Sequence, residues 1–294
     1  MFVTPMKNSQ EQFRLAIARI EKFSPAPAIL ARALTLLRDP HSDISDIAKL
    51  VGSDPSLTAD LIRCANSVFY GTGEPNQTIA EAVQKIGSTE TIRLLNLAVT
   101  RVVAKKHLGC YGISADNFWA ESLFNGLFLR NLASASGRAE ADQAYTVGLL
   151  RFLGRLAINQ AIEDNGGGLF WLGQESISAW EQESVGFVQA HAGATLLGKW
   201  KFSDDMVQAI AGQDDPSSLP APNWLAEALQ FTSLLFPQGL GVALQPPALD
   251  ESLAAPACVQ FMERYALSAA QITGIVETTF EDYSRTRRMI DPAV

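Results

Sequence analysis

The sequence predicts an all-α fold, and two kinds of observation lead to that class. Apolar residues recur at the three- and four-residue spacing of a helix along most of the 294-residue chain, and no run keeps the alternating apolar and polar order of a half-buried strand for more than a few positions. Proline, glycine and paired capping residues divide the chain into segments of helical length. We therefore expect a multi-helical protein.

Six helices are expected before residue 107. Ser9 and Gln12 form a capping box, in which each side chain can satisfy the other residue's backbone amide, and an apolar stripe that includes Phe13 and Ile17 follows it. Proline, glycine or Asp-Pro stops separate the later helices. These later helices are expected over residues 28–38, 42–51, 54–70, 78–86 and 89–106.

A second group of helices is expected after residues 109–114, which have the composition of a boundary. These helices are expected over residues 118–135, 142–162, 183–200, 203–213 and 224–236. Ser268 with Gln271 makes a second capping box, which begins the closing helix. This order divides the chain into an N-terminal helical subdomain, residues 1–110, and a C-terminal helical subdomain, residues 111–294.

The composition is that of an acidic globular protein. Apolar residues make up 47% of the chain and charged residues 18%, which excludes a disordered chain. The net charge of −8 and the pI near 5.0 argue against a nucleic-acid-binding protein, because phosphates require a basic face. Two small basic clusters, within residues 101–106 and 285–288, are better explained as solvated helix faces.

The cysteines and the apolar runs indicate where the protein resides. Cys64, Cys110 and Cys258 are far apart and form no Cys-x-x-Cys pair, so we expect free thiols and no zinc site. Free thiols fit a reducing cytoplasm. The N-terminus lacks the layout of a signal peptide, and proline and glycine interrupt the longest uncharged run, residues 228–249. We therefore expect a soluble, cytoplasmic protein without membrane insertion.

One predicted helix has an unusual end. Asp54 can cap it, and Pro55 suits the first helical position because its missing amide would have had no partner there. Two polar residues, two aromatic residues and a glycine close the helix: Asn66, Ser67, Phe69, Tyr70 and Gly71. In one interpretation the polar residues cap the helix and the rings enter the core, which composition alone favours. In the other, the helix end is a surface for a ligand or partner.

Residues 54–71 resemble the signature of the HDOD domains, bacterial signalling modules distantly related to the HD-type metal-dependent phosphohydrolases. The resemblance extends upstream to Phe23 and Pro25, continues downstream through residues 79–87, and reaches weakly past Trp200. It implies an HD-related fold in which the N-terminal subdomain packs on the HD-like C-terminal one. It also implies a non-enzymatic role in bacterial signal transduction, through other signalling proteins. The unusual helix end, with the groove between the subdomains, is then the candidate interaction surface.

The active relatives bind one or two divalent metals through an adjacent His-Asp pair and further histidines, because imidazole and carboxylate lone pairs bind the metal that activates a water. The matching positions in this chain are Glu121, Arg151, Phe152, His191, Gly212 and Gln213. Arg151 and Phe152 replace the His-Asp pair, and neither side chain offers a lone pair. Only His191 matches a ligand position, so the resemblance implies a dismantled metal site, no cofactor and no phosphohydrolase activity.

Three hypotheses remain open for this site. A buried Arg151 would need a partner, and Glu121 is the natural candidate for an ion pair that fills the former metal space. Alternatively, Arg151 anchors the phosphate of a small signalling nucleotide, such as a cyclic dinucleotide. A residual metal-dependent phosphohydrolase is the weakest, because His41 and His107, the other two histidines of the chain, lie outside the matching segments.

Other ligand motifs give weaker signals. The three glycines at residues 166–168 predict a flexible loop, which lacks the Lys-Ser/Thr that completes a phosphate-binding loop. Trp171, Trp180 and Trp200 could stack on a ligand, but core packing is the better explanation for each.

Overall fold

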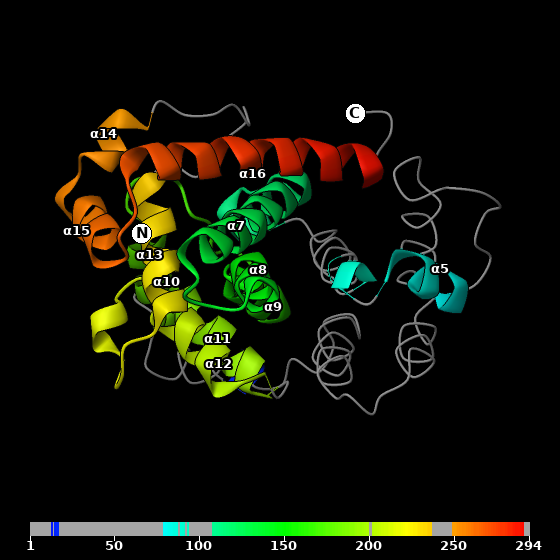
Figure 1. Ribbon diagram of the computed structural model, residues 1–294. Helices are drawn as coiled ribbons and strands as arrows, with labels where there is room; N and C mark the ends of the chain where they lie inside the picture. Colours follow the sequence, from blue (N-terminus) through cyan, green and yellow to red (C-terminus); the bar gives the residue numbers. More distant parts are fainter. Residues whose placement is uncertain are drawn as a thin grey trace.

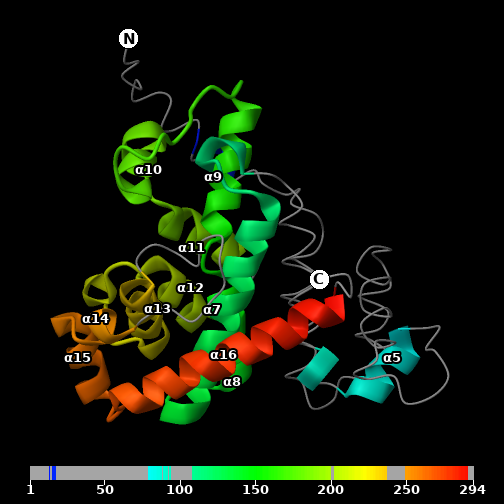
Figure 2. The same cartoon turned by 90° about the horizontal axis from the view of Figure 1, so that it is seen from above.

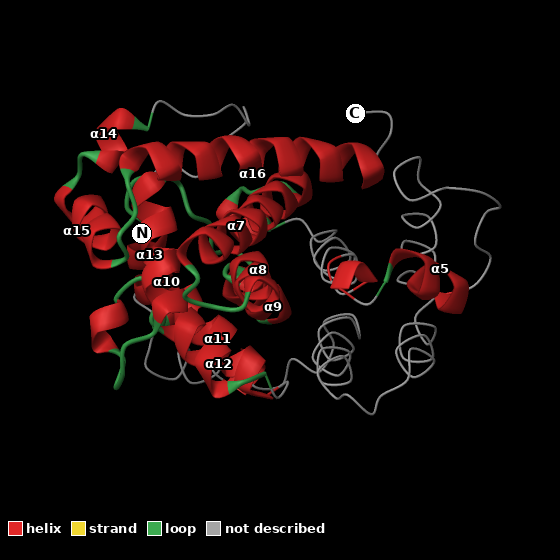
Figure 3. Ribbon diagram, viewed as in Figure 1, coloured by secondary structure: helices red, strands yellow, loops and turns green. Residues whose placement is uncertain are grey.

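The computed structural model describes residues 13, 15–17, 79–87, 89–91, 93, 108–199, 202–236 and 249–290. All regular elements within these residues are helices, and the one β-type pairing among them is an isolated bridge between Leu108 and Ile113 (Figure 3). The all-α class is therefore confirmed. None of the described helices is long and apolar enough to cross a membrane.

The described helices, drawn in Figure 1, have the bounds α5 (Ile79–Ile86), η1 (Gly109–Tyr111), α7 (Ala115–Ser136), α8 (Ala141–Leu150), α9 (Leu153–Asp164), α10 (Ile177–Val185), α11 (Gln189–Lys199), α12 (Asp204–Ala211), η2 (Pro216–Ser218), α13 (Trp224–Leu235), α14 (Asp250–Leu253), α15 (Pro256–Arg264) and α16 (Ala269–Ile290). Helix α7 packs on α8 and α16, and α11 joins α9 to α12, which in turn packs on α13. Both views show α16 lying across α7 (Figures 1 and 2).

Helices α7 and α8 form the central hairpin of the described structure. Ser114 caps α7 by accepting a hydrogen bond from the Asn117 amide at 3.1 Å, and Gly137 ends the helix with a φ of 62°. The two helices approach closely at Gly148, where an added Cβ would lie 2.4 Å from the backbone oxygen of Asn125. Glycine is therefore required at this crossing.

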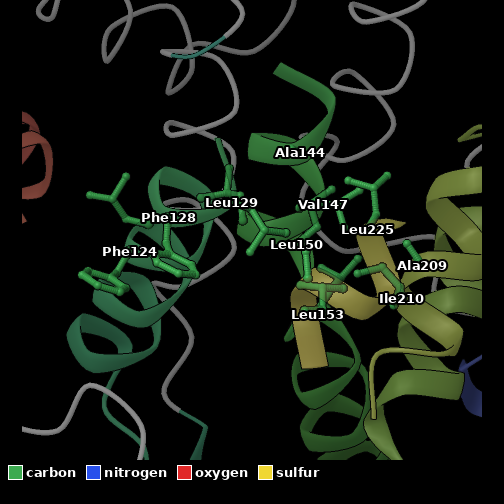
Figure 4. Packing of buried hydrophobic residues seen from close by; sticks show 14 of the residues in the cluster. Phe124, Phe128, Leu129, Ala144, Val147, Leu150, Leu153, Ala209, Ile210 and Leu225 are labelled. Atoms are coloured by element: carbon green, nitrogen blue, oxygen red, sulfur yellow. The ribbon is translucent and has the colours of Figure 1, made fainter. Parts of the chain in front are cut away.

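The core joins side chains from helices that are far apart in the sequence. Phe124 of α7 contacts Phe236, which follows α13, and Phe280 of α16, with ring centroids 5.2 and 4.8 Å away. The same cluster continues through α8 and α9 to α12 and α13. Its members on these helices that Figure 4 labels are Ala144, Val147, Leu150, Leu153, Ala209, Ile210 and Leu225. The core thus surrounds the junction between α8 and α9, where the candidate site lies.

Many expected elements are confirmed. Phe13 and Ile17 are helical and buried, and the predicted helices near residues 118–135, 203–213 and 224–236 correspond to α7, α12 and α13. The capping box before α16 forms in both directions: the Ser268 amide donates to Gln271 Oε1 at 2.8 Å, and the Gln271 amide donates to Ser268 Oγ at 3.2 Å.

Two expected helices are wrong, because each is divided in two. The helix predicted over residues 142–162 stops at Leu150 and restarts at Leu153, since Phe152 adopts φ −99° and ψ 11°, outside the helical region. The helix predicted over residues 183–200 is split between α10 and α11, where Gly186 has a φ of 84° and ends α10. The first of these breaks places Arg151 and Phe152.

Several expectations lie outside the described residues. They include the helices predicted over residues 28–70 and the candidate surface of Asn66, Ser67, Phe69, Tyr70 and Gly71. The division into residues 1–110 and 111–294 therefore stays a prediction.

Candidate functional site

Arg151 lies at the break between α8 and α9, and its side chain is 3% exposed. Its Nη1 donates to Asn125 Oδ1 of α7 at 2.7 Å, and its Nη2 donates to Ser233 Oγ of α13 at 2.5 Å. Its Nε is buried and has no acceptor. The guanidinium thus joins three parts of the helical core through neutral acceptors.

The expected ion pair between Arg151 and Glu121 is wrong. Both side chains are described, and no ion pair joins them; Arg151 instead uses Asn125, which lies one helical turn beyond Glu121. The Asn125 Nδ2 donates to the backbone oxygen of Glu121 at 2.7 Å, which leaves Oδ1 to accept from Arg151. The position of Asn125 on α7, and not the charge of Glu121, therefore decides the hydrogen-bond partner of Arg151.

Burial lowers the pKa of Arg151 to about 10. The negative charge of Asp214 opposes this change most, Arg155 adds to it by repulsion, and Glu121 opposes it more weakly than Asp214. At neutral pH the guanidinium therefore keeps its proton, and a positive charge occupies the position that the resemblance matches to the metal-binding His-Asp pair.

Gln213 and Gly212 follow α12 and complete the lining of this site. The Gln213 Nε2 donates to the backbone oxygen of Arg151 at 3.1 Å and to that of Ile210 at 3.0 Å. The first bond satisfies a carbonyl that the helix break leaves free. An added Cβ on Gly212 would lie 2.6 Å from Leu219. Gln213 therefore supports the backbone, and Gly212 leaves room for Leu219, at the two positions that the resemblance matches to metal ligands.

The Phe152 ring lies beside two arginines. The centre of the Arg151 guanidinium is 4.6 Å from the ring centroid, and that of Arg155 is 4.3 Å from it. Arg155 also lies 6.0 Å from the ring centroid of Tyr111. Within the described part of the chain, the half-buried Arg155 side chain has no hydrogen-bond or ion-pair partner, and its Nε is buried. The Arg155 guanidinium is thus packed against two aromatic rings, and its N–H groups have no acceptor among the described residues.

Sequence reasoning missed a buried carboxyl group next to this cluster. Glu181 Oε1 accepts from the Tyr111 hydroxyl at 2.9 Å, and its Oε2 accepts from the Gln189 amide, at the start of α11, at 2.7 Å. Burial is the main cause that raises the pKa of Glu181, and it also raises the pKa of Tyr111. No motif in the sequence separates this glutamate from the exposed ones around it.

His191 does not join the arginine cluster. It is exposed on α11 and lines a separate cavity of about 350 Å³, whose described lining residues also include Ile17 and Phe187. In the described residues no group of three or more His, Cys, Asp or Glu side chains could hold a metal ion. The structure thus brings Arg151, Phe152 and Gln213 together and leaves His191 outside.

The tryptophans differ in their surroundings. Trp180 is buried and meets the Tyr111 ring edge to face at 5.2 Å, as core packing requires. Trp171 is half-buried, and its indole donates to the backbone oxygen of Glu175 at 2.9 Å. Trp200 lies outside the described residues.

Comparison with known proteins decides the family. The model of the HDOD domain matches residues 24–216, about two thirds of the chain. The chain belongs to the HDOD domain family. A relative of this HDOD protein, an uncharacterized protein of Treponema pallidum (strain Nichols), is 26% identical over 196 residues, which are 65% of this chain and 37% of that protein. The HDOD protein therefore matches little more than a third of this relative's length.

Solved structures resemble the whole described fold. An HDOD domain protein with unknown function from Geobacter sulfurreducens has a TM-score of 0.66 at 19% identity, covering 97% of this chain and 98% of its own. A protein of Shewanella amazonensis SB2B, described provisionally as a phosphohydrolase, has a TM-score of 0.67 at 20% identity, covering 95% and 97%. A Marinobacter aquaeolei VT8 protein, described provisionally as a signal transduction protein, has a TM-score of 0.66 at 20% identity, covering 98% and 67%. At these identities the likeness confirms the HDOD-type fold.

Proposed function

We propose that this HDOD protein is a non-enzymatic signalling module that acts through protein–protein interaction in bacterial signal transduction. The observation that carries the proposal is the buried Arg151 guanidinium, at the position that the resemblance matches to the metal-binding pair of the active relatives. Family membership and the provisional description of the Marinobacter protein support a signalling role. The buried free thiols of Cys110 and Cys258 support a location in the reducing cytoplasm.

The chemistry of the site opposes metal binding. A guanidinium stays protonated at neutral pH, has no lone pair to offer, and repels a divalent cation. Phe152 has no donor atom. The Gln213 amide nitrogen holds the Arg151 carbonyl, and the buried Gln213 Oε1, which has no hydrogen-bond partner, is a single neutral oxygen beside a cation. If Arg151 and Gln213 bound a metal instead, then Asn125, Ser233 and the Arg151 carbonyl would lose their present hydrogen-bond partners. The polar groups of the site therefore support the packing of α7, α9, α12 and α13, and not catalysis.

The absence of metal chemistry is tested on the purified full chain. We expect no stoichiometric metal by plasma mass spectrometry and no hydrolysis of bis(p-nitrophenyl) phosphate with added Mn²⁺, Mg²⁺ or Fe²⁺. Turnover that EDTA abolishes would overturn the proposal. The interaction itself is tested by pull-down from the native cell, where an Asn66→Ala/Tyr70→Ala variant is expected to lose partners that the parent retains. Equal recovery of the same partners by both proteins would remove the helix end at residues 66–71 from the proposal.

A second candidate function, binding of a small signalling nucleotide, is favoured by Arg155. The terminal nitrogens of Arg151 are already used, but Arg155 lies against Phe152 and Tyr111 with no hydrogen-bond partner among the described residues. A guanidinium held in this way suits a phosphate. Calorimetry with cyclic dinucleotides decides the matter, using Arg155→Gln and the control Arg138→Gln, whose guanidinium lies over Tyr265 elsewhere at 5.7 Å. No heat for the parent would leave partner binding alone.

A further inference from the structure

We propose that the loop between α9 and α10 is the contact surface for a basic, apolar segment of a partner protein. The inference rests on the proposed function, because it assumes a protein partner. We call residues 165–176 the α9–α10 loop. Figure 2 shows α9 and α10 at the end of the molecule opposite α15, so this surface is distinct from the packed face beneath α16.

The α9–α10 loop exposes two large apolar side chains to solvent. Among the described residues, the large hydrophobic side chains that are exposed are Leu15 at 46%, Phe170 at 59% and Leu172 at 77%. Two of these lie within three residues of each other. Single exposed apolar residues are ordinary, but a concentrated pair on one loop indicates a contact with another molecule.

Exposure alternates along the loop, which shows that the exposed pair is not merely unpacked. Leu169 and Trp171 are half-buried and pack against the core, while Phe170 and Leu172 face solvent. The Trp171 amide donates to the backbone oxygen of Cys110 at 2.7 Å, and its indole donates to Glu175. The loop is therefore anchored through one set of side chains and presents the other.

Glycines fix the two ends of this apolar segment. The residues before it, Gly166, Gly167 and Gly168, have φ values of 96°, 70° and 90°, and Gly173 after it has a φ of 75°. The Gly167 amide donates to the backbone oxygen of Ile162 at 2.9 Å, which closes the end of α9. Left-handed glycines and the hydrogen bond that closes α9 make a defined turn. A preformed loop loses less conformational entropy on binding.

The charges of the chain on either side of the loop, from the residue after Arg155 onward, indicate the chemistry of its partner. From Leu156 to Gly198 the chain contains no lysine or arginine. The acidic residues of this stretch that are exposed are Glu163, Asp164, Glu175 and Glu183. A partner segment with lysine or arginine beside apolar side chains matches both features, because opposite charges favour the encounter and apolar contact supplies affinity. A second copy of the same loop, or an anionic membrane, would bring like charges together.

The test uses a phage-displayed random-peptide library panned on the full-length protein. Phe170→Ser/Leu172→Ser protein serves for counter-selection, and Leu15→Ser is the matched control because it removes another exposed apolar side chain. We expect the enriched peptides to place lysine or arginine beside apolar residues. Enrichment of acidic or uncharged peptides, or no enrichment above the counter-selected variant, would overturn the inference.

A selected peptide is then synthesised with a fluorophore, and its binding is measured by anisotropy. We expect the double variant to bind at least about tenfold more weakly and Leu15→Ser to differ less than about twofold. Raising the salt from about 50 mM to about 500 mM should weaken binding by the parent, because exposed charges are screened. Equal binding by parent and double variant would overturn the inference. Circular dichroism with a thermal melt checks that both variants fold, which exposed positions permit.

Two other occupants give distinct results. A dimer of the parent in sedimentation velocity that the Phe170→Ser/Leu172→Ser variant abolishes would identify a second copy and overturn the inference. If the parent binds phosphatidylglycerol vesicles and the same variant does not, the occupant is a membrane and the inference is overturned. The proposed function fails separately, through EDTA-sensitive turnover. If a pull-down depends on Asn66 and Tyr70 but not on Phe170 and Leu172, the proposed function stands and this inference falls.

Discussion

Arg151 shows how one residue can hold a buried positive charge without an adjacent negative one. Its terminal nitrogens donate to the neutral oxygens of Asn125 and Ser233, and the negative charge that most favours its ionised form is that of Asp214. A buried charge costs several kcal/mol unless hydrogen bonds replace its hydration. The two side-chain acceptors therefore decide whether the cation can remain in the core.

The first prediction concerns the acceptor. We expect Asn125→Ala to lower the free energy of unfolding by about 2–4 kcal/mol, because it leaves a buried charged donor without its acceptor. Arg151→Met should cost less, since the groups it leaves behind are neutral. Adding Arg151→Met to Asn125→Ala should therefore recover part of the loss. Urea denaturation of the three variants measures this coupling.

Asn117→Ala is the matched control, because Asn117 is exposed on the same helix. It should change the stability by no more than about 0.5 kcal/mol. Additive effects of Asn125→Ala and Arg151→Met would contradict the hydrogen bond as an energetic link between α7 and the junction of α8 and α9.

At the scale of elements, the crossing of α7 and α8 depends on one position. Gly148→Ala would place a Cβ 2.4 Å from the Asn125 backbone oxygen, which no side-chain rotation can relieve. We expect this variant to lose about 3 kcal/mol or more, or to fail to fold, because the two helices must separate. Gly198→Ala in α11 is the control: nothing lies within 4 Å of its added Cβ, so it should gain up to about 1 kcal/mol. Thermal melts of both proteins check the difference, and equal melting temperatures would show that the crossing tolerates a side chain.

Capping chemistry predicted element ends better than apolar periodicity did. The box of Ser268 and Gln271 forms as expected, because both hydrogen bonds are local. The break at Phe152 could not be predicted, since apolar residues at helical spacing continue across it and the Arg151 carbonyl is satisfied by Gln213, which is far away in sequence. Local signals therefore specify ends that local groups close, and they miss breaks that distant groups stabilise.

The positions of the candidate site could be predicted from the sequence, but the contacts between its side chains could not. The family resemblance located Arg151, Phe152 and Gln213, which the structure assembles. The partner of Arg151 was predicted from charge alone and missed Asn125 by one helical turn, because sequence does not fix the rotation of α7 about its axis. Arg155 carried no sequence signal, since its lack of a hydrogen-bond partner among the described residues is a property of the packed structure.

At the scale of the whole molecule, acidic groups influence stability in two ways. The net charge of −8 produces a general repulsion that weakens as the pH falls toward the pI near 5.0. Glu181 adds a specific contribution, because its carboxyl is buried between η1, α10 and α11. Burial opposes its ionisation most, and the hydrogen bond from the Gln189 amide, the charge of Arg155 and the hydrogen bond from Tyr111 favour it, while the charge of Asp214 opposes it.

The last prediction follows from the raised pKa of Glu181. Its ordinary value is 4.5, and the folded state binds the proton more tightly than the unfolded chain does. Stability from this group is therefore greatest at low pH and falls as the pH rises from the unfolded toward the folded pKa. The free energy of unfolding of Glu181→Gln, relative to that of the parent, should be higher at about pH 7.5 than at about pH 5, because an amide needs no proton to be neutral. Urea denaturation of both proteins at the two pH values measures the difference, which also cancels the general repulsion common to them. The difference between the two proteins could instead be the same at both pH values, or could favour Glu181→Gln more at about pH 5. Either result would show that the hydrogen bonds from Tyr111 and Gln189 outweigh burial at this carboxyl.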